Sequence, residues 1–155
     1  MISTEQIFAD LFALASQVQG ADWSATPIPL EVSTRSWISP SSVNSGQMPW
    51  LQQLELPEDR NRTGLGLSRR KLHALIDIVL QRQPVYPLTQ PFSTILNSFI
   101  NSMDALFFMQ NPPAFIAQNF HNNIEDFYIT KITIDEGQLV TPACLRFWVE
   151  IVTGQ

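Results

Sequence analysis

The chain has 155 residues, which is the size of one domain of roughly 100–200 residues, so we expect a single domain over residues 1–155. Hydrophobic residues make up 45% and charged residues only 15%, which excludes a disordered chain and leaves much of the surface to uncharged side chains. The net charge of −5 argues against duplex nucleic acid as the principal ligand, because such binding depends on Lys and Arg contacts to phosphate.

Cys144 is the single cysteine, which excludes a disulfide within the chain and a zinc site built from several thiolates. No basic segment precedes an apolar run at the N-terminus, and no run reaches the roughly 18 apolar residues that a membrane span needs. We therefore expect a soluble, unsecreted protein.

Hydrophobic periodicity predicts helices and strands that alternate in blocks along the chain. Apolar residues spaced by three and four indicate a helix with Ser3 or Thr4 as its N-cap, and the same spacing recurs after Pro91. The predicted elements are a helix over 5–18, strands over 30–38, 50–56 and 71–80, a helix over 91–109, and strands over 127–134 and 143–152. This order predicts an α+β fold in which two helices pack on one face of a mainly antiparallel twisted β-sheet.

Two connections are distinctive. Residues 57–66 are polar, charged and contain two glycines, and we expect a mobile loop there. Pro112 and Pro113 break the second helix, and the pattern over 114–123 fits a short helical turn or an irregular connection.

Five of the nine basic residues lie close together beside the predicted mobile loop: Arg60, Arg62, Arg69, Arg70 and Lys71. They form either a solvated surface or a surface that docks onto acidic residues of an identical subunit or another protein. In an acidic chain the second interpretation favours self-association driven by charge, and we take these five as the candidate interface residues.

Signatures of catalysis are absent from the sequence. It contains no Gly-x-Ser-x-Gly, no Gly-x-x-x-x-Gly-Lys, no Gly-x-Gly-x-x-Gly and no His-Glu-x-x-His motif. His73 and His121 are more simply surface or hydrogen-bonded histidines, and Cys144 an inert buried thiol, than catalytic groups. We expect no enzymatic activity, no cofactor and no bound metal. The alternative is a small binding module or enzyme with a polar site of His73, Asp77 and His121.

Several segments, in this order and spacing, resemble the tail terminator proteins of tailed bacteriophages, which also occur in gene transfer agents. The resemblance covers most of the chain and rests on an N-terminal amphipathic helix, a charged Gly-containing loop before a long strand, and closing strands connected through Gly137. Its remaining segments are Ser33-Thr34-Arg35, Met48-Pro49-Trp50-Leu51, and a helix that leads from Leu96-Asn97 to Asp104-Ala105.

The resemblance implies a structural protein rather than an enzyme. Family members form a ring, usually of six copies, that caps the head-proximal end of the tail tube, stops tube polymerisation and joins the tail to the head. The implied partners are further copies of the chain, the tail tube protein and a head completion or neck protein, with DNA only passing through the ring. The implied location is the virion, after assembly in the host cytoplasm. Another head-tail connector protein is the alternative from the same class.

Overall fold

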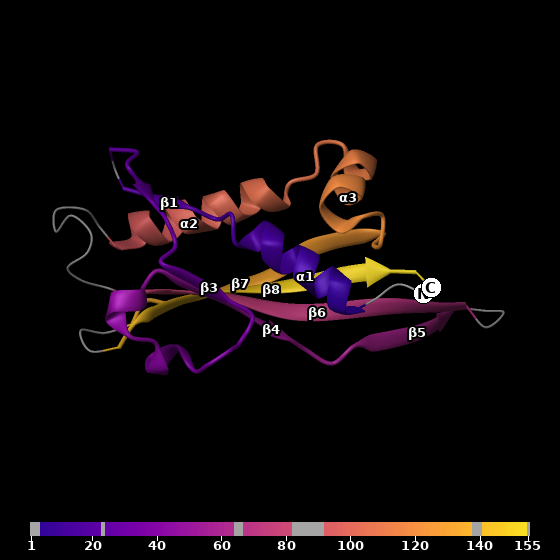
Figure 1. The fold of residues 1–155 in the computed structure, drawn as a ribbon, viewed down its shortest axis with the longest axis horizontal. Helices are drawn as coiled ribbons and strands as arrows, with labels where there is room; N and C mark the ends of the chain where they lie inside the picture. The colour runs from indigo at the N-terminus through magenta and orange to yellow at the C-terminus, as the bar shows by residue number, and fades with distance from the viewer. Residues whose placement is uncertain (1–3, 23, 64–66, 82–91, 138–140, 155) are drawn as a thin grey trace.

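Three helices cover one face of a six-stranded, mainly antiparallel sheet, so the fold is α+β as predicted (Figure 1). The computed structural model describes residues 4–22, 24–63, 67–81, 92–137 and 141–154, and at 59–63 and 67–69 it describes the backbone alone. The helices are α1 (Thr4–Ala15), α2 (Phe92–Phe107) and α3 (Pro112–Phe120). The strands are β1 (Gly20–Ala21), β2 (Pro27–Ile28), β3 (Val32–Thr34), β4 (Trp50–Glu55), β5 (Asp59–Thr63), β6 (Leu67–Leu80), β7 (Asp126–Asp135) and β8 (Ala143–Thr153).

The 14-residue strand β6 organises the sheet, whose order is β3-β4-β6-β8-β7. Along one side β6 pairs with β8 from Arg70 opposite Thr153 to Leu80 opposite Ala143. Along its other side it pairs first with β5 and then with β4. All these ladders are antiparallel, and the short β3 is parallel to β4. Strands β1 and β2 form a separate two-stranded sheet beside α2.

The main core lies between the sheet and the helices. Alternate residues of the central strands point to this side because strand side chains alternate between the two faces. Fully buried sheet residues on this side include Leu51, Leu72, Ile76, Ile78, Leu80, Leu145, Phe147 and Ile151. They pack against buried helix residues, among them Ile7, Leu11, Ile95, Phe99 and Phe120. The predicted apolar stripe of α2 is therefore confirmed as its buried face.

Residues 112–120 form a third helix, in the region where the sequence fitted either a short helical turn or an irregular connection. Asn111 caps it by accepting a hydrogen bond from the Ala114 N–H, 3.4 Å, and Pro112 supplies a first-turn proline. The prolines that end α2 thus begin α3. Its side chains Phe115 and Phe120 lie against Phe127 of β7, with ring centroids 5.5 and 5.0 Å apart.

Two further predictions need correction. The strand expected over 30–38 is limited to β3, because the chain then leaves the sheet edge and crosses its other face. The loop expected over 57–66 contains β5, which pairs with residues 67–71 of β6. Residues 64–66 lie outside the described residues. Strand pairing satisfies the backbone groups of this polar segment without burial of a large apolar surface, which is why composition alone indicated a loop.

Candidate assembly surfaces

The hairpin formed by β5 and β6 gathers the candidate basic residues at one end of the sheet. In its register Arg60 lies opposite Arg70, Asn61 opposite Arg69, and Asp59 opposite Lys71. The hairpin extends beyond the neighbouring strand β4 at the right-hand end of Figure 1. The predicted cluster is therefore brought together by strand pairing.

Arg70 already holds a carboxylate of its own chain. Its guanidinium forms an ion pair with Glu58 and donates from Nη2 to the Thr4 hydroxyl at 2.6 Å. Lys71 Nζ lies 3.9 Å from Glu150 Oε1, and about a third of the Lys71 side chain is exposed. Arg70 therefore ties the hairpin base to the start of α1.

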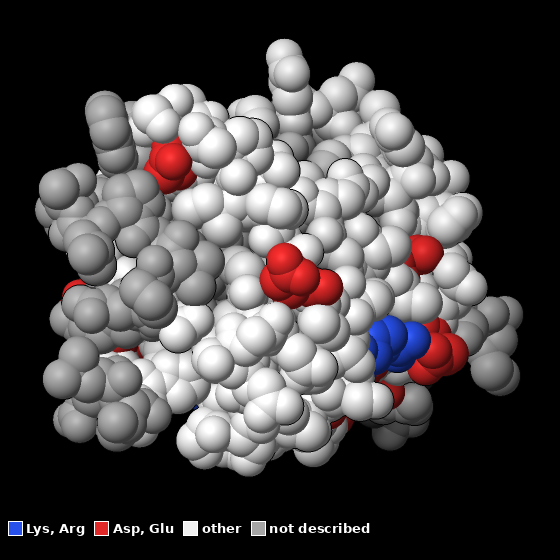
Figure 2. Space-filling view, turned by 60° about the vertical axis from the view of Figure 1, so that its left-hand side comes forward, with Lys and Arg blue, Asp and Glu red and all other residues white. Residues whose placement is uncertain are grey.

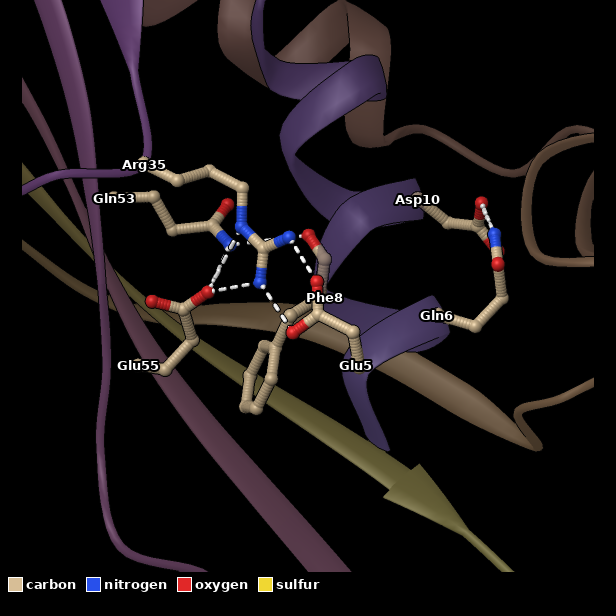
Figure 3. Close-up of polar contacts among 7 residues, drawn as sticks. All are labelled: Glu5, Gln6, Phe8, Asp10, Arg35, Gln53 and Glu55. Atoms are coloured by element: carbon tan, nitrogen blue, oxygen red, sulfur yellow. Dashed lines mark hydrogen bonds and ion pairs between the residues drawn. The ribbon is translucent and has the colours of Figure 1, made fainter. Parts of the chain in front are cut away.

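A second set of charged residues fixes α1 to the sheet (Figure 3). Arg35 lies between two carboxylates, donating to Glu5 Oε1 on α1 at 2.5 Å and to Glu55 Oε1 on β4 at 2.5 Å. The hydrogen bond to Glu5 raises the pKa of Arg35, and the same bond lowers the pKa of Glu5. Beside them, Gln53 donates to the Phe8 carbonyl at 3.1 Å. Arg35, part of the segment that carried the family resemblance, thus has a positioning role.

Asp77 organises the face of the sheet that the helices leave uncovered. Its carboxylate is fully buried and accepts from Arg146 Nε at 2.8 Å and Nη2 at 3.1 Å. It also accepts from Trp37 Nε1 at 2.8 Å and Gln52 Nε2 at 3.1 Å. Gln52 in turn exchanges hydrogen bonds with both backbone groups of Ile38. This network holds the segment over 35–49 against the sheet.

From the sequence, Asp77 was predicted only as part of the alternative polar site, and this network was not predicted. The sequence does hold a signal for the network, because Asp77 lies within the most apolar part of the longest strand. A carboxylate buried there requires hydrogen-bond or ion-pair partners. The partners come from β4, β8 and the 35–49 segment, which lie far from Asp77 in the sequence.

The residues of the alternative polar site do not converge. His121 ends α3 in the left-handed region, at φ 54°, and contacts Asp10 of α1 at 3.0 Å, on the helix side of the sheet. His73 and Asp77 alternate with the helix-facing residues of β6 and therefore lie on the opposite face. The sheet separates His121 from the other two.

Cys144 is buried as predicted, and that burial raises the pKa of its thiol to about 12, which keeps it in the unreactive protonated form. In the described part of the chain, no group of three or more His, Cys, Asp or Glu residues is placed to hold a metal ion.

Charge is unevenly distributed over the molecule. Residues 57–71 contain five Lys or Arg and two Asp or Glu, whereas the other residues contain four and twelve. Residues 36–54 contain no charged residue at all. The face in Figure 2 is accordingly mostly uncharged, with isolated acidic groups and a basic group next to an acidic one. The hairpin segment and this face thus differ in their content of charged residues.

Comparison with models of protein families finds no match for this chain, and comparison with curated proteins finds none either. Among the described helices, none is both long enough and apolar enough to cross a membrane.

Proposed function

We propose that this protein is a structural assembly protein of a tailed bacteriophage, a tail terminator that caps the head-proximal end of the tail tube. It would form a ring, stop tube polymerisation and provide the surface to which the head or neck binds. The proposal rests on the family resemblance of the sequence together with the kind of surface that the fold exposes.

One observation carries the proposal: Asp77 and Asp10 are used to hold the fold, while charge is divided unequally between the hairpin and the rest of the chain. Asp77 is fully buried with four hydrogen bonds, and Asp10 contacts His121. A ring needs heterologous contacts, in which one patch of a subunit meets a different patch of the next. A basic hairpin at one end and an acidic remainder meet that requirement.

The proposed partners follow from the ring. They are further copies of the chain around the ring, the tail tube protein on one side and the head completion or neck protein on the other. DNA would only pass through the ring. The virion is the proposed location, with assembly in the host cytoplasm.

Deletion of the gene from its phage tests the proposal directly. We expect tails of uncontrolled length that do not join heads, and we expect the wild-type chain supplied in trans to restore both properties. Electron microscopy of the lysates measures tail length and joining. Tails of normal length joined to heads would contradict the assignment, and normal tails beside tailless heads would instead support a head completion protein.

The proposed absence of catalysis has a separate test. Purified wild type and the His73→Ala and His121→Ala variants should show the same background turnover of phosphate esters and peptides. An activity that disappeared in either variant would favour the alternative small enzyme.

A further inference from the structure

We propose that Arg60 and Arg62 of one copy dock into a hollow at the opposite end of the sheet of the next copy, beside Asp135. This inference rests on the proposed ring and names the contact that would close it.

The hollow has a volume of about 430 Å³ and lies on the helix-free side of the sheet, where η1 (Pro40–Ser42) crosses the ends of β7 and β8. Five of its lining residues offer side-chain oxygens, and two prolines lie beside them. These seven residues are Ser39, Ser41, Thr133, Asp135, Thr141, Pro40 and Pro142.

This chemistry suits an arginine. A guanidinium carries five N–H donors in a planar fork, so it can bind a carboxylate and hydroxyl oxygens at the same time. The prolines provide an apolar wall for the aliphatic part of the side chain. Asp135 is exposed at the end of β7, where its Oδ1 accepts from the Gly137 N–H at 2.9 Å.

Charge favours a cation in the hollow even though Arg146 lines it. The Arg146 guanidinium is bound by both carboxylate oxygens of the buried Asp77, so this pair contributes no net charge. The Asp135 carboxylate therefore makes the net charge of the hollow negative. The basic hairpin supplies the complementary charge, and such complementarity steers two surfaces together and fixes their register.

The hairpin cannot reach the hollow of its own subunit. Strand β5 pairs with residues 67–71 of β6, whereas Asp135 lies opposite Cys144, which is itself opposite Val79. Eight residues of strand from Lys71 to Val79 span roughly 26 Å. In Figure 1 β5 lies at the end of the sheet opposite to the end where β8 begins, so a contact between the hairpin and the hollow joins two copies head to tail. Repetition of that contact closes a ring or extends a chain.

A charge exchange in the full-length chain tests the contact. We expect Arg60→Glu with Arg62→Glu, and separately Asp135→Arg, to weaken self-association by roughly tenfold or more, and the three changes together to restore it. Mass photometry and sedimentation over a concentration series measure the association. Asp104→Arg is the matched control for Asp135→Arg. Lys131→Glu is the matched control for Arg62→Glu alone. Each control makes the same charge change elsewhere and should leave association unchanged.

Cross-linking provides the second measurement. In a Cys144→Ala background, Arg62→Cys together with Ser41→Cys should form disulfide-linked oligomers on oxidation, whereas either cysteine alone should form at most dimers. Absence of the ladder, or no restoration by the combined charge exchange, would overturn the contact.

The two proposals fail differently. Rings on tail tubes without this cross-link would retain the terminator function and overturn the contact. Cross-linked chains that leave tail length unregulated would retain the contact and contradict the function.

Discussion

The two faces of the sheet are covered in different ways by alternate residues of the same strands. On the helix side, β6 presents Leu72, Ile76 and Ile78 to helices that bury them through apolar contact. On the other side, the next residues of the strand include Asp77, which holds an irregular segment through directional hydrogen bonds. One face is held mainly by apolar packing, and the other by a charge with its partners together with a small apolar cluster of Val43, Met48, Val79 and Cys144.

The difference shows how a short chain can cover both faces of a sheet. A helix satisfies its own backbone groups and needs only an apolar stripe to dock. The 35–49 segment is almost free of regular structure apart from two short 3-10 turns, so its position depends on specific partners such as Gln52 and Asp77. Substitutions on the helix side should therefore act through lost apolar packing, and substitutions around Asp77 on the other side through lost hydrogen bonds.

The largest effect is expected from Phe99→Ala on the helix side. Phe99 is fully buried, and its removal should lower the free energy of unfolding by roughly 3–5 kcal/mol, since both transfer energy and packing are lost. Urea denaturation measures this change. Thr94→Ala, on the exposed side of α2, is the control and should be nearly neutral. An unchanged stability of Phe99→Ala would contradict the helix-side core.

Asp77→Asn tests the other face. The variant keeps the size of the side chain but removes the charge that Arg146 binds, and we expect a loss of roughly 2–3 kcal/mol, typical of hydrogen bonds to charged groups. Because Trp37 donates to the same carboxylate, its fluorescence should change while the helical circular dichroism stays constant. If the helical signal were lost together with the change in Trp37 fluorescence at low denaturant, the two faces would not be independent.

Gly20→Ala measures how closely β1 approaches α2. A Cβ at Gly20 would lie 2.4 Å from the Phe99 ring, so either the ring or the strand must move. We expect a loss of roughly 1–2 kcal/mol from overpacking, measured by thermal and urea unfolding. The Gly46→Ala control has open space around its Cβ and should be tolerated. Combining Gly20→Ala with Phe99→Leu should recover part of the loss if the clash is its cause.

The smallest effect concerns the Glu5 to Arg35 ion pair at the surface. Arg35 lowers the pKa of Glu5 from its ordinary value of 4.5. A carboxyl whose pKa is lower in the folded state adds stability above pH 4.5, and this stability is lost as pH falls through the folded-state pKa. Glu5→Gln should therefore reduce the difference in stability between pH 7 and pH 3. Urea midpoints at pH 7 and pH 3 measure this difference in wild type and in the variant. The same difference in both would show that the Glu5 to Arg35 pair does not contribute to the pH dependence of stability.

The sequence predicted elements whose periodicity comes from one buried face. α1, α2, β4, β7 and β8 lie within a few residues of their expected bounds because apolar spacing determines them. The sequence did not predict β5, because this strand is stabilised by pairing with β6. It also did not predict the path of the chain at Trp37, which depends on the Asp77 carboxylate 40 residues away. Likewise, Arg70 was expected to find its acidic partner on a neighbour, yet Glu58 of its own chain binds it.

The interactions of Arg70 also bring the two ends of the chain together. Its side chain binds Thr4, and its backbone lies opposite Thr153, so the beginning of α1 and the end of β8 meet at the base of the basic hairpin. A tag fused directly before α1 or directly after β8 would therefore lie next to the hairpin that we propose for assembly. A circular permutant that joins these ends and opens the chain near Gly46, in the exposed 3-10 turn over 45–47 before β4, would move such a tag to the other end of the sheet, where the hollow lies.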